Sequence, residues 1–157
     1  MTNPEVVISE WIETAQELGF EIMKLTGEVR TGKNDFNFWM NKLSSYYTEK
    51  TGMTFFPGTL NIHLTNGKYY LPQDCLRLEK EEYSGTVSIS MVACRILGKN
   101  AYILRTDSDT GKHGYSKEQI LEIATDVKLR DEFNLKDGDL VEVEIDVGNF
   151  EMIENAV

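Results

Sequence analysis

Apolar and polar residues alternate in several short stretches of the chain, as they do in strands that bury one face. The clearest example is the segment TLNIHL, in which Leu60, Ile62 and Leu64 are expected to point into a core. Thr59 and Asn61 share the opposite face, directly after the turn that the preceding Pro-Gly pair predicts. The segment therefore presents a hydroxyl and an amide together on one side of a buried strand.

Further stretches with strand character are residues 21–30, 68–71, 86–96, 101–106 and 139–146. The letters LGKN between two of these stretches predict a tight hairpin, and KDG (136–138) predicts a turn before the last strand. The apolar positions of EQILEIA (118–124) fit either a strand or a helix.

Helical spacing of apolar residues occurs in two longer segments and one short one. Residues 3–18 begin with Asn3 and Pro4, which suit a helix cap and a first turn, and they carry an apolar stripe. We interpret this helix as an appendage for packing or for a homodimer contact. A second helix is predicted over Asn37–Gly52, ending at the glycine, and a short one over 126–133.

Many short strands with two inserted helices predict a mainly β fold that closes into a small barrel, because closure removes exposed strand edges. Strict alternation of strands and helices is missing, which disfavours a doubly wound sheet. The expected organisation is an N-terminal helical appendage (1–20), one barrel domain (21–147) and a C-terminal tail (148–157).

Composition narrows the classes of function. The chain of 157 residues is 41% hydrophobic, as in globular domains, and has a formal net charge of −10. This acidic excess argues against non-specific binding to nucleic acid or to an anionic membrane. No apolar run reaches the roughly 20 residues of a membrane span, and the first residues do not resemble a signal peptide. Cys75 and Cys94 are expected to be buried, reduced thiols of a cytoplasmic protein.

The letters GEVRTGKN (27–34) nearly match the phosphate-binding loop G-x-x-x-x-G-K-[ST]. Asn34 stands where that motif needs a hydroxyl for a magnesium ion, so the motif itself is rejected. A Gly-Lys turn between a strand and a helix still offers backbone N–H groups to a phosphate. The segment therefore remains a nucleotide-binding candidate.

Three segments together resemble the archaeal CTP-dependent riboflavin kinases. PGTLNI (57–62) is similar to the G-T-L-N segment of that family, and 121–145 is similar to its closing pattern around K-L-R and L-K-D-G-D. GEVRTGKNDFNFW (27–39) parallels its glycine-rich segment. The resemblance implies a cradle-loop barrel that transfers a phosphoryl group from a nucleoside triphosphate, with CTP as the expected donor, to riboflavin, giving FMN.

In that family the threonine and asparagine of G-T-L-N hold a magnesium ion beside the nucleotide phosphates, which implies the same role for Thr59 and Asn61. Neutral oxygen ligands suit Mg²⁺ when phosphates supply the negative charge. Mg²⁺ is therefore the expected cofactor, and the expected partners are riboflavin or FMN and a nucleoside triphosphate.

The resemblance also assigns residues to the two substrates. Glu122 falls at the position of a flavin-contacting glutamate and is expected to orient the ribityl chain or to accept its proton. Gly114 and Tyr115 fall in the segment expected at the flavin. The nucleotide-binding candidates are Gly32, Lys33, Asn34, Asp35, Phe36, Asn37, Phe38, Val127, Lys128, Leu129 and Arg130.

Phe36 is the sharpest departure, because the family has a glycine at this position. A benzyl group there either blocks backbone approach to the phosphates or stacks on a base or flavin ring. A blocked loop would make the protein a non-catalytic flavin or nucleotide sensor, which is the alternative function. A structural barrel that recruits a partner through its N-terminal helix is a third reading. The turn NLKDGD (134–139) is interpreted as part of the fold and not of the site.

Overall fold

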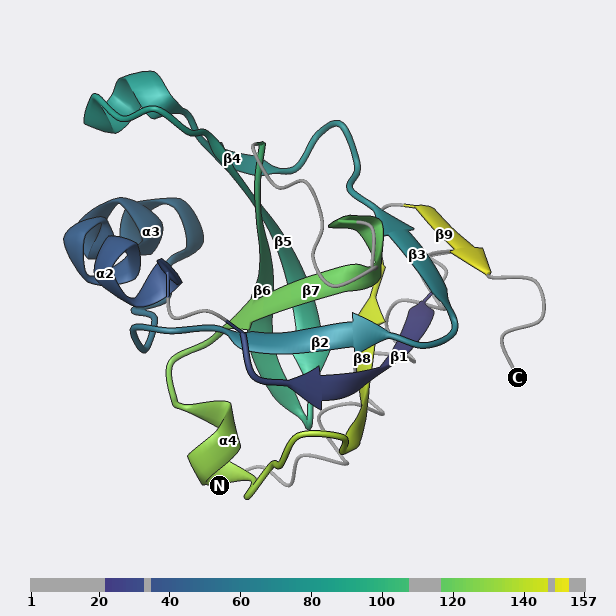
Figure 1. Cartoon of the computed structure of the whole chain (residues 1–157). Coiled ribbons are helices and arrows are strands. Elements are labelled where there is room, and N and C mark those ends of the chain that lie inside the picture. Colours follow the sequence, from purple (N-terminus) through teal and green to yellow (C-terminus); the bar gives the residue numbers. More distant parts are fainter. Residues whose placement is uncertain (1–21, 33–34, 108–116, 147–148, 153–157) are drawn as a thin grey trace.

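The computed structural model of this chain describes residues 22–32, 35–107, 117–146 and 149–152. Figure 1 shows the described elements arranged around one barrel. In chain order they are β1 (Met23–Arg30), α2 (Asp35–Lys42), α3 (Ser44–Thr51), β2 (Leu60–Leu64), β3 (Gly67–Tyr70), β4 (Leu76–Leu78), the 3-10 helix η1 (Lys80–Tyr83), β5 (Ile89–Ile96), β6 (Lys99–Thr106), the 3-10 helix η2 (Lys117–Gln119), β7 (Ile120–Ala124), α4 (Leu129–Glu132), β8 (Leu140–Ile145) and β9 (Asn149–Met152).

Six strands form a closed antiparallel barrel, which confirms the predicted fold class. The strand order is β5-β6-β7-β2-β1-β8, and a short pairing of β5 with β8 closes the ring. In that closing pair Arg95 lies opposite Glu144, and Ile96 lies opposite Val143. β4 extends the sheet beyond β5, and β3 pairs with β9 in a separate two-stranded sheet. Closure leaves the six barrel strands without free edges.

The inside of the barrel is filled by the apolar residues that the alternating pattern selects. In β2, Leu60, Ile62 and Leu64 are at most 5% exposed, whereas Asn61 and His63 between them are partly exposed. The predicted orientation of this strand is therefore confirmed. Because β2 is fixed from inside by its apolar residues, its polar face has a fixed direction at the barrel surface.

A second apolar cluster joins the helices to the extended part of the sheet. Met40, Leu43 and Tyr47 are buried against residues of β4, β5 and β6. The single helix predicted over 37–52 is wrong in one respect, because it is divided at Leu43 into α2 and α3. Leu43 has φ −102° and ψ 14°, outside helical values. The bonds from Leu43 N to Trp39 O and from Tyr47 N to Leu43 O carry the helical register across this point, so the apolar face continues.

Other expectations meet the structure with smaller differences. The ambiguous segment 118–124 contains strand β7, and the helix predicted over 126–133 is reduced to the short α4. The hairpin between β5 and β6 is confirmed: Leu97 and Gly98 both have positive φ, 52° and 77°, as a two-residue hairpin turn requires. Strands β4 and β9 and both 3-10 helices were not predicted, and β9 lies within the segment assigned to a C-terminal tail. The predicted N-terminal helix, with its proposed dimer contact, lies outside the described residues.

The two cysteines differ. Neither forms a disulfide, as expected. Cys94 is 3% exposed inside the barrel, and burial raises the pKa of its thiol. The prediction that Cys75 is also buried is wrong, since this residue is only partly covered at the margin of the core.

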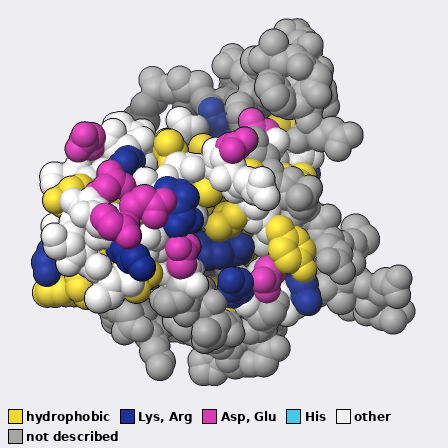
Figure 2. Space-filling view, turned by 90° about the horizontal axis from the view of Figure 1, so that it is seen from above, with side chains coloured by type: hydrophobic (Ala, Val, Ile, Leu, Met, Phe, Trp, Pro, Cys, Tyr) yellow, Lys and Arg dark blue, Asp and Glu magenta, His cyan; other side chains and the backbone are white. Residues whose placement is uncertain are grey.

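Charged side chains of both signs lie interspersed on the face seen in Figure 2, so the acidic excess does not collect there as one patch. Ion pairs such as Lys50 with Glu82 and Arg77 with Asp107 join opposite charges at N–O distances of 2.7 and 2.8 Å. In the part of the chain that the structure covers, every helix is too short or too polar to cross a bilayer.

Candidate functional site

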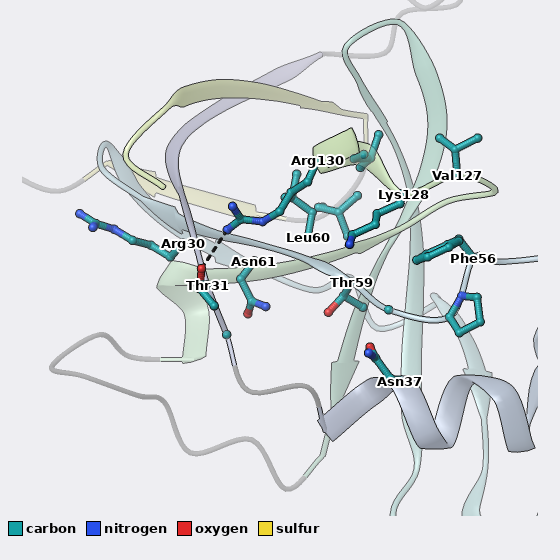
Figure 3. A pocket seen from close by; sticks show the side chains of 15 residues that line it. Arg30, Thr31, Asn37, Phe56, Thr59, Leu60, Asn61, Val127, Lys128 and Arg130 are labelled. Atoms are coloured by element: carbon teal, nitrogen blue, oxygen red, sulfur yellow. Dashed lines mark hydrogen bonds between the residues drawn. The ribbon is translucent and has the colours of Figure 1, made fainter. Parts of the chain in front are cut away.

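One cleft of about 380 Å³ lies where the start of β2 meets the end of β1, the first turn of α2 and the segment leading into α4 (Figure 3). Leu60 and Ile123, which face each other across β2 and β7, form its base. Its lining residues are Arg30, Thr31, Gly32, Asn37, Phe56, Pro57, Gly58, Thr59, Leu60, Asn61, Ile123, Val127, Lys128, Leu129 and Arg130. Residues up to about a hundred positions apart in sequence, such as Arg30 and Arg130, therefore line the same cleft.

The two polar residues of the G-T-L-N segment both line this cleft. Thr59 and Asn61 are partly exposed there, while Leu60 between them is buried. Figure 3 shows Asn61 near Thr31 and Thr59 farther along the strand, toward Asn37. The hydroxyl and the amide therefore reach the same space from one strand, as their spacing predicts.

Two glycines allow side-chain amides to approach the backbone in the cleft. A Cβ atom on Gly32 would lie 2.3 Å from Asn61 Nδ2 and 2.9 Å from Asn61 Oδ1. A Cβ atom on Gly58, which has φ +139°, would lie 2.9 Å from Asn37 Oδ1. Any larger residue at Gly32 would displace the Asn61 amide, because real Cβ contacts do not become that short.

Three cations line the cleft, and each is paired with a carboxylate. Arg30 pairs with Glu28 two residues earlier on the same strand. Lys128 Nζ lies 3.8 Å from Asp131 Oδ2, with both side chains exposed. Arg130 Nη2 lies 2.5 Å from Asp137 Oδ1 and 3.3 Å from Thr31 Oγ1. The three cationic side chains line the cleft whereas their carboxylate partners do not, which suits an anionic ligand.

Asp137 connects the turn NLKDGD, which is interpreted as part of the fold, to residues of the cleft. The turn itself is confirmed: Asp139 N donates to Lys136 O at 3.0 Å, and Gly138 has φ +91°. The Asp137 carboxylate, however, accepts the Thr31 hydroxyl at 2.9 Å and the Arg130 guanidinium. The hydrogen bond from Arg130 and then the one from Thr31 lower the pKa of Asp137. This residue therefore supports two lining residues of the cleft.

The remaining predicted residues divide into three groups. Glu122 lies on β7 opposite Asn61 of β2, which puts both side chains on the same face of the sheet, although Glu122 does not line the cleft. Phe38 is 64% exposed on α2 and lies outside the lining. Asp35 and Phe36 open α2, but their side chains are not among those described. Lys33, Asn34, Gly114 and Tyr115 lie outside the described residues.

Several residues that line the cleft were not among the predicted site residues, namely Arg30, Thr31, Phe56, Pro57, Gly58, Leu60 and Ile123. Arg30 is the last residue of β1, opposite Asn61 in the ladder. Phe56 precedes the Pro-Gly turn and is 38% exposed. The doublet Phe55-Phe56 could have indicated the position of Phe56. Phe55 is 7% exposed in the second apolar cluster, and successive side chains of an extended segment point to opposite sides, so Phe56 points away from that cluster.

The donor set fits a magnesium ion that is shared with phosphate. Among the residues the structure places, no group of three or more His, Cys, Asp or Glu side chains is arranged to hold a metal ion. Thr59 and Asn61 offer hard, neutral oxygens, and Gly32 leaves the space in which the Asn61 amide lies. Such ligands suit Mg²⁺ when phosphate oxygens and water complete its shell. A metal carried by the protein alone would need more carboxylates.

The sequence of this chain matches a known protein family. Residues 29–145 match the model of the family CTP-dep_RFKase, which is described as a domain of unknown function, DUF120. The chain belongs to this family of CTP-dependent riboflavin kinases. Every lining residue of the cleft lies within the matched span.

Individual members of the family are similar over most of this chain. The riboflavin kinase of Archaeoglobus fulgidus is 32% identical over 136 residues, which cover 78% of this chain and 54% of that protein. The riboflavin kinase of Pyrobaculum aerophilum is 33% identical over 138 residues, 78% of this chain and 60% of that protein. That of Thermofilum pendens is 35% identical over 112 residues, 64% and 48% respectively. The chain thus spans about half to three fifths of the length of these relatives.

Proposed function

We propose that this chain transfers a phosphoryl group from a nucleoside triphosphate to riboflavin, giving FMN, with CTP as the donor and Mg²⁺ as the metal. One observation carries the proposal. Residues that the family resemblance assigns to the nucleotide (Gly32 and 127–130) and to its metal (Thr59 and Asn61) line a single cleft. The relatives named riboflavin kinase support the reaction, and the family name supports CTP.

The two ends of the cleft differ in polarity, which suggests how the nucleotide lies. Arg30, Thr31 and Arg130 gather at one end, and Phe56 and Val127 gather at the other (Figure 3). Phosphates favour the first end, because guanidinium and hydroxyl groups donate charge-assisted hydrogen bonds. A nucleobase favours the second end, where an aromatic ring and apolar side chains can stack on it.

Phosphoryl transfer needs positioning and charge neutralisation more than covalent help from the protein. When bound, Mg²⁺ supplies Lewis-acid neutralisation of the donor phosphates. Thr59 and Asn61 would hold it from the strand side, and Lys128 and Arg130 would face the same phosphates from the opposite side. Gly32 lines the cleft, and its backbone N–H group would donate to a phosphate oxygen.

Glu122 is proposed to handle the second substrate. It is the direct cross-strand neighbour of Asn61, and such neighbours have Cβ atoms about 4.5–5.5 Å apart. The Glu122 carboxylate would lie beside Thr59 and Asn61 but outside the nucleotide cleft. This position suits contact with the riboflavin hydroxyl that must approach the terminal phosphate. Its role there is to orient the ribityl chain and to accept the proton of the attacking hydroxyl.

The test is direct. The purified chain is incubated with riboflavin, Mg²⁺ and CTP, ATP, GTP or UTP in separate reactions, and FMN is separated chromatographically. We expect FMN with CTP, less or none with the other three, and none when EDTA removes the metal. A clear preference for ATP would remove the donor assignment alone.

Failure of turnover has two distinguishable forms. Tight, Mg²⁺-dependent binding of CTP or riboflavin without FMN would replace the kinase by a non-catalytic sensor. Absence of binding to either compound would contradict the ligand assignment of the cleft altogether.

A further inference from the structure

Asp137 contacts two segments that line the cleft and lie far apart in sequence. Its Oδ1 and Oδ2 atoms are both 2.9 Å from the Thr31 hydroxyl, at the end of β1. Its Oδ1 atom is 2.5 Å from Arg130 Nη2, in α4. Arg130 Nη2 also lies 3.3 Å from Thr31 Oγ1, so the three groups form a closed triangle of contacts. We refer to Thr31, Arg130 and Asp137 as the clamp.

The backbone fixes the turn that carries Asp137 to both of its partners. Val29 N donates to Asp139 O, and Gly138 N donates to Val29 O, each at 2.8 Å, so the turn is joined to β1. Leu135 N donates to Arg130 O at 2.9 Å, which joins the same segment to the end of α4. The carboxylate thus has a defined position between β1 and α4 before any ligand binds.

The clamp uses only part of the Arg130 guanidinium. All of its contacts with described residues are made through Nη2. Nε and Nη1 keep their N–H donors while the side chain lines the cleft. An arginine held at one nitrogen loses less side-chain freedom when the others bind an oxyanion, which favours binding.

We propose that Asp137 is a positioning residue for the nucleotide. It holds the Arg130 guanidinium and the Thr31 end of the glycine-containing segment in the arrangement that receives the phosphates. This inference rests on the proposed function and deepens it. It assigns part of the affinity for the triphosphate to Asp137, although the charge of this carboxylate alone would repel the ligand. The opposite view, in which Asp137 competes with the phosphates for Arg130, predicts tighter binding once the carboxylate is removed.

The experiment compares Asp137→Ala and Asp137→Asn with the matched control Asp131→Asn. Asp131 is a carboxylate on the same helix as Arg130 and pairs at 3.8 Å with Lys128 of the cleft. Binding of CTP with Mg²⁺ is measured by calorimetry, and thermal unfolding of each variant confirms that it is folded. We expect about 10-fold weaker binding for Asp137→Ala, by analogy with the outer partners of ligand-holding side chains. We expect Asp137→Asn to lie between parent and Asp137→Ala, and Asp131→Asn to bind within about two-fold of the parent.

A double-mutant cycle separates positioning from general support of the fold. If Asp137 acts through Arg130, Asp137→Ala should have little further effect on CTP binding in the Arg130→Ala background. A purely structural role would give the same loss in both backgrounds.

Amide hydrogen exchange at Val29 gives a readout without ligand, since Val29 N donates to Asp139 O in the turn that carries Asp137. We expect faster exchange in Asp137→Ala.

Two results would overturn the inference while leaving the proposed function intact. One is parent-like or tighter CTP binding by Asp137→Ala, and the other is an equal loss in the cycle with and without Arg130. Absence of nucleoside triphosphate binding in the parent would instead remove the proposed function and this inference together.

Discussion

The two walls of the cleft are built by different kinds of contact. The strand wall (Arg30, Thr31, Gly32, Thr59 and Asn61) carries neutral side chains except for Arg30 at the end of β1. It is shaped by close packing, with the Asn61 amide where a Gly32 side chain would lie. The helix wall (Val127–Arg130) carries two cations, each paired with a carboxylate. Ligand binding at the strand wall should therefore respond to the addition of a single methyl group. Binding at the helix wall should respond to changes in side-chain charge, salt concentration and pH.

The largest effect is expected from Asn61→Ala, because this change removes from the strand wall an oxygen that we propose to hold the metal. Mg²⁺-dependent CTP binding should weaken by about 100-fold, the upper end of the effects seen for groups that support a metal. The melting temperature should hardly change, since the amide is partly exposed and makes no contact within the core. Calorimetric titration with and without Mg²⁺ measures CTP binding, and thermal unfolding measures the melting temperature.

The matched control is Asn66→Ala, just beyond the other end of β2. Asn66 Oδ1 accepts a hydrogen bond from Thr26 N at 3.2 Å. Its loss should cost about 1 kcal/mol of stability with binding unchanged. If Asn61→Ala behaved like this control, Asn61 would be structural.

Gly32→Ala should have the next largest effect. The added Cβ would meet Asn61 Nδ2 at 2.3 Å, so the amide must move out of the position in which we propose that it holds the metal. Turnover should fall about 10- to 100-fold. FMN formation under saturating substrates measures it.

Gly52→Ala controls for the loss of a glycine as such. Gly52 has φ +75° at the end of α3, and a Cβ there would meet no atom within 4 Å. This variant should lose about 1 kcal/mol of stability through backbone strain and keep its turnover. Equal turnover in Gly32→Ala and the parent would show that the strand wall tolerates displacement.

Arg130→Ala tests the helix wall and should weaken CTP binding by about 10-fold, the loss of one hydrogen bond to a charged group. Because the interaction is between charges, the difference from the parent should shrink as salt is raised. Arg130→Lys should recover little, since one ammonium cannot serve both Asp137 and a phosphate in the fork geometry of arginine. A salt-independent loss, measured over a series of ionic strengths, would contradict an electrostatic role.

The smallest effect concerns stability and pH. Hydrogen bonds lower the pKa of Asp137 in the folded protein, so its ionised form stabilises the fold above the ordinary pKa of aspartate. This contribution is lost as the pH falls through the lowered pKa. The free energy of unfolding of the parent should thus exceed that of Asp137→Asn at neutral pH, and the two should converge in acid. Urea unfolding at several pH values measures the gap, and a gap that is constant with pH would exclude the clamp as its cause.

The sequence predicted those strands and turns whose pattern of apolar, polar and turn-forming residues lies within a few consecutive positions. The alternation around Ile62 and the Leu97-Gly98 hairpin are of this kind, and both are confirmed. The division at Leu43 was not predictable from periodicity, because Met40, Leu43 and Tyr47 keep helical spacing across it. Strand β9 was missed because its only described partner, β3, is about eighty residues away in sequence.

The candidate site was predictable where a motif names side chains of one segment, as for Thr59 and Asn61. Asp137 was assigned to a turn because its neighbours Lys136 and Gly138 explain the turn fully. Its second role depends on Thr31, at a sequence separation of 106 residues, which no local pattern encodes. The effect of Phe36 stays a prediction, to be tested by Phe36→Gly and FMN formation.

The pairing of β1 with β8 also affects how the chain folds into the closed barrel. Met23 pairs with Ile145, so the barrel cannot close until nearly the whole domain has been synthesised. Pairings this distant in sequence slow folding, because the intervening loop must be ordered before the contact is gained. The same step brings the turn containing Asp137 against the end of β1. A nascent or partly folded chain therefore has no complete cleft, and binding competence should appear together with barrel closure during refolding.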